Sequence, residues 1–384
     1  MFGAQRIWSG ISGKWAVLFA LLAGLLVPVA NAQTWSWQTE TVDQAGKFSS
    51  LTADAEGNLH LSYSDRDGKI RYGFRAKSTG KWFTMVLDDG DGFSDITLDQ
   101  QGNPHVCFVF RVVKYASFDG KAWHVQPIAT DAARISFSCA VGIGPDGTPH
   151  VSWYRDQNAD SSYYTHLKYA VLENDIWVIR TVDFDTQTGK WHSMIVDARG
   201  VPHLSYDAFV KGDLKYAFWD GKRWVIKTVD FRGRTSRAHN IGMGNALLLD
   251  SKGQARISYH DGESLKLARQ QGDTWTVETV DNVVALGSWV GWRTSLVLDR
   301  RGFAHISYED AGTLKHAYWD GAKWRIQVIA PRGSEPYRYS SMTIDKDDTI
   351  YISYRDSQDG SLQLAIGRWK EQPQTAATEK KEKD

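Results

Sequence analysis

Seven copies of one motif, four short β-type runs within each copy and the lack of helical periodicity predict an all-β fold, a seven-bladed β-propeller. Each blade is expected to hold four antiparallel strands. The composition agrees, because 17 Trp, 16 Tyr, 15 Phe and 34 Gly among 384 residues are typical of short strands joined by tight turns. One ring of this size is a single domain.

The chain begins with a segment that predicts export. Arg6 and Lys14 precede an apolar run from Trp15 to Ala30, and Ala30-Asn31-Ala32 supplies the small residues of a cleavage site. An uncleaved membrane anchor is the alternative, but the run of 16 residues is shorter than the ~20 that span a bilayer. We therefore expect a signal peptide over residues 1–32, a propeller over 33–369 and a disordered polar tail over 370–384, with the mature protein in the periplasm or outside the cell.

The copies align on one position at the start of the second run of each unit. Successive copies lie 45 to 53 residues apart, with this position occupied by His60, His105, His150, His203, Arg256, His305 and Tyr351. In the fourth unit the expected strands are 192–197, 202–206, 214–219 and 224–229. Asp-Ala-Arg-Gly separates the first two, and Asp220-Gly221 is a hairpin turn between the last two.

The two ends of the repeat region complement each other. A Trp opens the fourth run of six units, namely Trp82, Trp123, Trp177, Trp224, Trp275 and Trp324, whereas the seventh unit lacks this run. The missing run is found near the other end, where residues 37–43 (WQTETVD) match 275–281 (WTVETVD). The N-terminal strand is therefore expected to complete the last blade, so that no sheet edge is left free at the junction.

Most repeated residues are expected to serve the fold. The repeated His residues belong to different blades, so they could share a metal ion only by pointing into the channel, and hydrogen-bonded core histidines are the favoured interpretation. The Trp residues that open strands are expected to pack in the core. Cys107 occupies the position held elsewhere by Ser62, Ser152 and Ser205, and Cys139 opens the third unit. A disulfide between adjacent blades and two free thiols remain alternatives.

Charge and motifs exclude several functions. With 45 Lys+Arg against 45 Asp+Glu, the chain has no overall charge that would favour nucleic acid, and no membrane span is expected after signal cleavage. No phosphate-cradling loop, CxxC metal site, haem-attachment motif or nucleophile elbow occurs. No cofactor is predicted. A calcium ion remains possible among the strand-end Asp residues, but no calcium-binding motif is present.

The irregular parts of the repeat lie on one face of the expected ring. This linking face carries the connections between units and the loops that join second to third strands, whereas the turn face carries the short, uniform turns. The insertions of the linking face are 131–138, 157–165, 184–191, 231–243, 282–293 and 331–339. Since loops on a rigid scaffold concentrate binding residues, their aromatic and basic side chains are candidate binding residues: Trp191, Arg234, Arg237, His239, Trp289, Trp292, Arg293, Tyr337 and Arg338.

Four acidic residues reach the same face at the ends of second strands. They are Asp65, Asp261, Asp310 and Asp356, each in a Tyr-x-Asp sequence. As binding residues they would complement the basic loops. The alternative is structural, because Asp residues at such positions cap turns or pair with neighbouring arginines.

The repeat, D-x-x-G-x-x-H-(I/L/V)-S-Y followed by L-K-Y-A-x-W-D-G-x-x-W, resembles that of exported bacterial propellers grouped loosely with sialidase-like (BNR-like) repeat proteins. The resemblance covers nearly the whole mature chain and implies the propeller architecture. It assigns no catalytic residue, because the sialidase Asp-box S-x-D-x-G-x-T-W is absent and an arginine triad cannot be placed. Propellers of one architecture host unrelated functions.

The sequence therefore favours a non-catalytic protein that binds a glycan or a protein partner through the linking face. Two alternatives stay open. One is a glycan-cleaving hydrolase or lyase, in which Arg237 and His239 would hold a carboxylate and an Asp or Tyr would handle the proton. The other is a scaffold subunit of an envelope complex.

Overall fold

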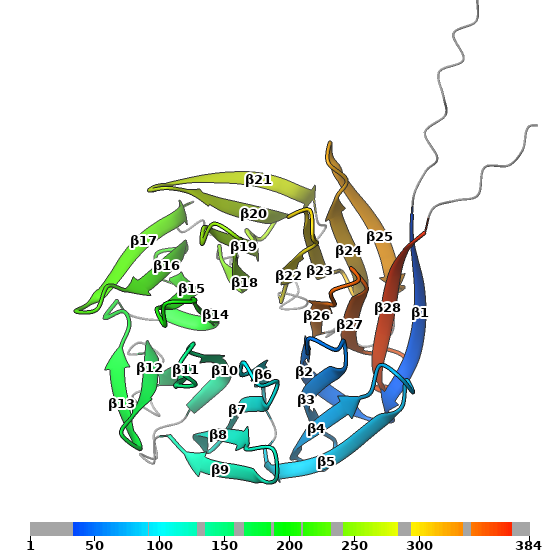
Figure 1. The fold of residues 1–384 in the computed structure, drawn as a ribbon. Coiled ribbons are helices and arrows are strands. Elements are labelled where there is room, and N and C mark those ends of the chain that lie inside the picture. Colours follow the sequence, from blue (N-terminus) through cyan, green and yellow to red (C-terminus); the bar gives the residue numbers. More distant parts are fainter. Residues whose placement is uncertain are drawn as a thin grey trace, which may run out of the picture. The chain divides into compact units, whose positions relative to one another are not determined.

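All regular elements in the described part of the chain are β-strands, which form seven sheets of four around a central opening (Figure 1). The computed structural model describes residues 34–90, 92–128, 135–156, 165–185, 188–208, 210–231, 241–282, 293–332 and 339–370. This confirms the predicted seven-bladed propeller with four antiparallel strands per blade. The predicted signal peptide and nearly all of the predicted tail lie outside the described residues.

The first three blades follow one another along the chain. Blade 1 consists of β2 (Gly46–Ala53), β3 (Leu59–Asp65), β4 (Lys69–Arg75) and β5 (Trp82–Asp89). Blade 2 consists of β6 (Ser94–Leu98), β7 (Pro104–Phe110), β8 (Val112–Phe118) and β9 (Trp123–Pro127). Blade 3 consists of β10 (Ile135–Ile143), β11 (Pro149–Asp156), β12 (Thr165–Glu173) and β13 (Ile176–Thr181).

The next three blades repeat this order. Blade 4 consists of β14 (Thr188–Val196), β15 (Pro202–Ala208), β16 (Asp213–Trp219) and β17 (Trp224–Phe231). Blade 5 consists of β18 (Met243–Leu249), β19 (Ala255–His260), β20 (Ser264–Gln271) and β21 (Thr274–Asn282). Blade 6 consists of β22 (Ser295–Leu298), β23 (Ala304–Asp310), β24 (Thr313–Trp319) and β25 (Trp324–Ala330).

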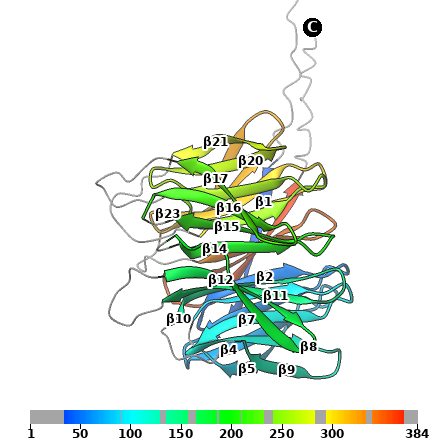
Figure 2. The ribbon, with the colours of Figure 1, turned by 90° about the vertical axis from the view of Figure 1, so that its left-hand side faces the viewer.

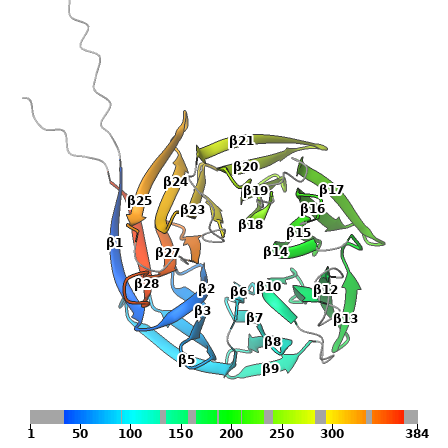
Figure 3. The same cartoon turned by 180° about the vertical axis from the view of Figure 1, so that it is seen from behind.

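Blade 7 is assembled from both ends of the described chain. Its first three strands are β26 (Ser340–Ile344), β27 (Ile350–Arg355) and β28 (Leu362–Lys370), and its fourth is β1 (Thr34–Asp43), which lies beside β28 at the outer edge (Figure 3). Trp37 on β1 donates from its indole N–H to the side-chain oxygen of Gln327 in blade 6, at 3.2 Å. Because β1 pairs with β28, the first and last segments of the ring belong to one sheet.

The hydrophobic cores lie between neighbouring blades, whose sheets stack around the ring (Figure 2). For example, one cluster joins Cys107 and Tyr115 of blade 2 to Val141 and Trp153 of blade 3. Each of the seven clusters also receives one of the Trp residues that open outer strands: Trp37, Trp82, Trp123, Trp177, Trp224, Trp275 and Trp324. These side chains are half-buried, so they pack in the core as predicted but at its margin.

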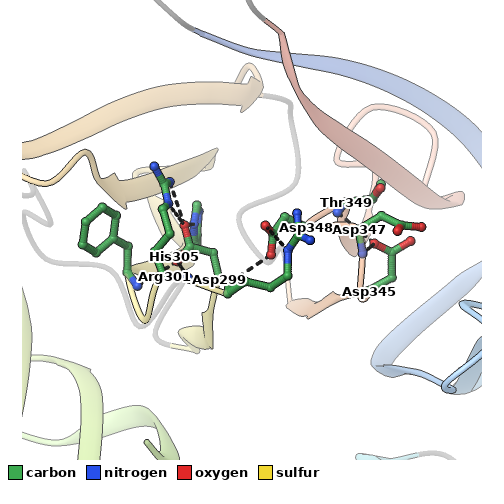
Figure 4. A network of polar contacts seen from close by, with 9 residues as sticks. Asp299, Arg301, His305, Asp345, Asp347, Asp348 and Thr349 are labelled. Atoms are coloured by element: carbon green, nitrogen blue, oxygen red, sulfur yellow. Dashed lines mark hydrogen bonds and ion pairs between the residues drawn. The ribbon is translucent and has the colours of Figure 1, made fainter. Parts of the chain in front are cut away.

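The repeated histidines are buried and hydrogen-bonded, as predicted. Their Nδ1 atoms lie 2.5 to 2.8 Å from tyrosine hydroxyls of the third strand in the pairs His60–Tyr72, His105–Tyr115, His150–Tyr169 and His203–Tyr216. The Asp that begins the preceding turn approaches the other ring nitrogen in several blades. Figure 4 shows this arrangement in blade 6, where Arg301 (2.7 Å) and His305 (3.8 Å) approach the Asp299 carboxylate.

The corresponding turn of blade 7 departs from the repeat. Six blades have Gly in the left-handed conformation at its fourth position, whereas blade 7 has Asp348 with a φ of 57°. This strained conformation is accompanied by a new contact, because the Asp348 carboxylate accepts a hydrogen bond from Arg300 of blade 6 at 2.8 Å (Figure 4). The substitution therefore links two blades on the turn face.

Contacts between most neighbouring blades account for the Ser that recurs in the second strands. Among the described residues, Ser152 is an exception, because its hydroxyl group has no hydrogen-bond partner. The Ser of each second strand faces one position of the next blade's inner strand, as in Ser62–Ser94 (2.9 Å), Ser258–Thr294 (2.7 Å), Ser307–Ser340 (3.0 Å) and Ser353–Ser49 (2.9 Å). Cys107 and Cys139 occupy the same two positions between blades 2 and 3, with Cα atoms 6.3 Å apart, and form a disulfide. The covalent bond thus replaces one hydrogen bond of the ring.

The described part of the chain contains no helix with the length and apolarity that crossing a membrane requires.

Candidate functional site

Side chains from the inner strands meet at the axis of the ring on the linking face. Successive residues of a strand point to opposite sides, and one alternate set of the inner strands is buried between blades, as with Ser49 and Leu51 in β2. The other set faces the axis. We call its members nearest the linking face the first axial layer, which comprises Phe48, Phe93, Ser138, Trp191, Gly244, Arg293 and Tyr339, one from each blade.

The large side chains of the first axial layer touch one another across the ring. The Phe93 ring lies 4.3 Å from Phe48, 5.1 Å from Tyr339 and 5.6 Å from Trp191, measured between centroids. The guanidinium carbon of Arg293 lies 5.2 Å from the centre of the same ring. These residues belong to blades 1, 2, 4, 6 and 7, so they come together only because the sheets converge on the axis. Phe93 is buried, and the other four are half-buried.

Bulges at the starts of inner strands help to place this layer. The pairing register shifts between Lys47 and Ser50 in β2 and between Thr188 and His192 in β14. Such shifts redirect side chains next to binding sites. Phe48 and Trp191 lie inside these two shifts, and Phe48 has a φ of 57°, which is uncommon for an aromatic residue.

The second axial layer lies two residues further along each inner strand. Six of its seven members are Ser or Ala, and the list is Ser50, Asp95, Ala140, Ser193, Ala246, Ser295 and Ser341. Several of the serines accept a hydrogen bond from a backbone N–H of the next blade, as Ser295 does from Met342 at 2.9 Å. Asp95 is the exception, because it places a carboxyl group where its equivalents are uncharged.

Asp95 is held by hydrogen bonds to both neighbouring blades. The Ser50 hydroxyl donates to Oδ1 at 2.7 Å, and the Val141 N–H donates to Oδ2 at 3.0 Å. Burial raises the pKa of Asp95, although these hydrogen bonds and the charge of Arg293 oppose the shift. Burial also lowers the pKa of the Arg293 guanidinium, and Asp95 opposes that shift. Asp95 and Arg293 therefore interact electrostatically without forming an ion pair.

The backbone of Trp191 is held by the buried carboxyl group of Asp207. Asp207 is fully buried on β15, and its Oδ1 accepts the Trp191 backbone N–H at 3.1 Å. Among the described residues, its Oδ2 has no hydrogen-bond partner. Burial therefore raises the pKa of Asp207 to about 7, because the charged form loses its hydration.

Replacement of Asp207 by Asn should stabilise the protein more at pH 8 than at pH 5. A carboxyl group whose pKa rises from 3.8 to about 7 on folding contributes most stability below pH 3.8, and this contribution is lost as the pH rises to about 7. The advantage of the Asn variant over the wild type should grow by about 2 to 3 kcal/mol between pH 5 and pH 8, measured by urea unfolding. Asn keeps an oxygen for the Trp191 N–H.

Comparing Asp207→Asn with the wild type at each pH cancels the pH-dependent contribution of the buried histidines to stability. Burial lowers the pKa of His150, His192 and His260 to about 4. Their contribution is therefore present above pH 6.5 and is lost as the pH falls toward 4, but it is common to both proteins. An advantage of Asp207→Asn that does not change with pH would show that the pKa of Asp207 is not raised.

The structure brings together two of the predicted binding residues, Trp191 and Arg293, which both contact Phe93. The predicted positions of both were in irregular insertions. This was wrong for Trp191, because the bulge lets β14 begin at Thr188 and include it. The other predicted aromatic and basic residues lie outside the described residues: Arg234, Arg237, His239, Trp289, Trp292, Tyr337 and Arg338.

The four predicted aspartates lie away from the axial layers and make contacts within their own blades. Asp65 pairs with Arg71 at 2.6 Å, and Asp310 pairs with Lys315 at 2.6 Å. Asp261 accepts the backbone N–H of Ser264 at 2.7 Å and lies 3.5 Å from Lys266, and Asp356 accepts the N–H of Gln358 at 2.7 Å. The structure thus places them as partners of third-strand cations or as turn caps.

Sequence reasoning missed Phe48, Phe93 and Asp95. The available signal was their position in the aligned repeat, since the first axial layer varies from Gly to Trp between blades and Asp95 stands among Ser and Ala. Their convergence required the ring.

Concave sites on the turn face are less suited to a ligand. Cavities of about 510 and 460 Å³ lie between blades 7 and 1 and between blades 5 and 6. Most cations that line them are already paired, as in Arg75–Glu40 (2.6 Å), Lys77–Asp347 (2.7 Å) and Arg256–Asp250 (3.0 Å). Among the described residues, no group of three or more His, Cys, Asp or Glu is arranged to hold a metal ion.

No family model matches the chain, and no curated protein matches it. Solved structures do match. The Aleuria aurantia lectin in complex with Fucα1-6GlcNAc has a TM-score of 0.53 and 16% identity over 77% of this chain and 99% of its own. An ulvan lyase of a new polysaccharide lyase family, bound to GlcA(1-4)Rha3S, has a TM-score of 0.58 and 11% identity over 86% and 95%.

A virginiamycin B lyase from Staphylococcus aureus, with quinupristin, has a TM-score of 0.59 and 10% identity over 86% of this chain and 99% of its own. At these identities the similarity shows the fold alone.

Proposed function

We propose that this protein is an exported, non-catalytic propeller that binds a carbohydrate through the first axial layer and the linking face around it. The observation that carries the proposal is the contact of Phe48, Phe93, Trp191 and Tyr339 at the axis. The rings of Phe48, Trp191 and Tyr339 are half-buried around the buried Phe93, and partly exposed aromatic rings offer apolar faces on which a sugar ring can stack. Export is proposed from the predicted signal peptide.

The chemical content of the layer favours binding over cleavage. The first axial layer contains four aromatic residues and one Arg but no carboxylate, whereas most glycoside hydrolases use a pair of carboxyl groups that flank the bond. Asp95, the acid of the second axial layer, uses both oxygens in hydrogen bonds to neighbouring blades. The propellers of similar fold include a lectin and a polysaccharide lyase, so sugar ligands suit this architecture.

Trp191→Ala should weaken binding of the recognised polysaccharide about tenfold, because a lost aromatic contact is worth about 0.5 to 1.5 kcal/mol beyond the buried area. Binding to a panel of polysaccharides is measured by affinity electrophoresis and calorimetry with the purified full-length protein. The matched control is Trp219→Ala, which removes a half-buried Trp from the same blade, where it packs edge-to-face against Trp224 on the turn face.

Equal binding by Trp191→Ala and the wild type, or equal losses in both Trp variants, would contradict the proposed surface. Release of reducing or unsaturated sugars from any polymer of the panel would contradict the non-catalytic proposal.

A further inference from the structure

We propose that Arg293 binds an anionic group on the sugar, a uronate carboxylate or a sulfate ester, at the first axial layer. This inference rests on the proposed function and specifies the class of its ligand as acidic polysaccharide. It follows from the pairing state of Arg293, from its position over the Phe93 ring and from the charges around it.

Arg293 is a half-buried cation without an ionic partner in the part of the chain that the structure describes. Among the described residues, no carboxylate lies within 4.0 Å of its guanidinium, and its side chain donates no hydrogen bond to any of them. Six other arginines of the ring are paired with carboxylates at 2.5 to 3.0 Å, namely Arg71, Arg75, Arg256, Arg269, Arg301 and Arg325. Because a desolvated charge without a partner is costly, an Arg that is unpaired among the described residues is well placed to receive an anion.

The aromatic contact orients Arg293 for such an anion. Its guanidinium carbon lies over the Phe93 ring, 5.2 Å from the ring centre, and an aromatic ring in this position leaves N–H groups of the guanidinium unused. These N–H groups present a planar fork that matches a carboxylate or a sulfate with two parallel hydrogen bonds. The half-buried rings of Trp191 and Tyr339 in the same layer would contact the sugar that carries the anion.

Among the described residues, the ionisable groups near Arg293 leave its charge available. Asp95 is beyond ion-pair distance and directs its oxygens to Ser50 and Val141. His192, which follows Trp191, has a pKa lowered to about 4 by burial, so it is neutral at pH 7. Within the first axial layer itself, Arg293 is the only charged member, since the others are aromatic residues, Ser138 and Gly244.

The test compares three polymers of similar length with the full-length protein: a polyuronate, a sulfated polysaccharide with a neutral backbone, and a neutral polysaccharide. The wild type should bind one anionic polymer at least tenfold more tightly than the neutral one. Arg293→Gln should remove this preference, a loss of roughly 10- to 100-fold that corresponds to one charged hydrogen-bonded contact. Arg293→Lys should retain part of it, because Lys keeps the charge without the fork.

Two controls separate charge recognition from general effects. Arg325→Gln removes an arginine on blade 6 that is paired with Asp320, and it should bind like the wild type. Thermal unfolding of each variant shows whether it is folded. Preference for the polyuronate assigns a carboxylate ligand, and preference for the sulfated polymer assigns a sulfate.

The outcomes also distinguish this inference from the proposed function. Equal affinity for neutral and anionic polymers, with binding lost in Trp191→Ala and unchanged in Arg293→Gln, would overturn the anion site and leave the carbohydrate-binding surface intact. Binding of none of the three polymers would overturn both.

Discussion

Replacement of Trp35 by Ala is expected to lower the free energy of unfolding by about 4 kcal/mol, near the middle of the range for a buried Trp. Trp35 lies on β1 with 5% of its surface exposed. Its ring packs edge-on against His305 at 5.2 Å, His316 at 5.7 Å and Trp369 at 5.4 Å. The side chain therefore joins the first strand of the chain to blades 6 and 7.

The loss should come from packing alone, because the Trp35 indole N–H has no partner among the described residues. Chemical unfolding followed by far-UV circular dichroism measures it without relying on tryptophan fluorescence. The control is Phe231→Ala, which truncates a side chain that is 68% exposed and should change stability by less than about 0.5 kcal/mol. A similar small change for Trp35→Ala would show that β1 is not packed against the ring in solution.

Replacement of both Cys107 and Cys139 by Ser is expected to lower the free energy of unfolding by about 3 kcal/mol. The two residues are separated by 32 positions, and a cross-link that closes a loop of this length restricts the unfolded chain by about 3 to 4 kcal/mol. Two Ser side chains should recover a small part of this, because they recreate the Ser62–Ser94 contact found one blade earlier.

Reduction provides an independent measurement of the same bond. A thiol reductant should lower the stability of the wild type to about that of the double Ser variant and should not affect the variant itself. Two results together would show that the disulfide does not contribute to stability. The wild type would be insensitive to a reductant that reaches the unfolded state, and the double Ser variant would be as stable as the wild type.

Much of the fold could be predicted from the sequence because each repeat copy carries the local signals that place its strands and turns. Apolar alternation places the strands, Asp-x-x-Gly and Asp-Gly place the turns, and the His and Tyr of one blade satisfy each other, as in His203 and Tyr216. These interactions are local or act between identical neighbours, so counting repeats sufficed to predict the blades.

The site was less predictable because its members are distant in sequence and differ in type. Trp191 and Arg293 were recognised as aromatic and basic residues in irregular segments, but nothing in the sequence indicated that Phe93 would lie between them. The state of the two cysteines was also open, since the sequence shows that both occur at repeat positions but not that these positions face each other with Cα atoms 6.3 Å apart.

By itself, the sequence determined the seven-bladed architecture, the order of strands and turns, and the structural role of the repeated His and Trp residues, since periodic patterns encode local structure and repeated contacts. Only the tertiary structure decided that the residues least alike among the copies, from Phe48 to Tyr339, form one layer and that Asp95 lies behind it. It also decided that no carboxylate of the described residues pairs with Arg293. The physical reason is ring closure, which brings blades that are far apart in the chain to a common axis.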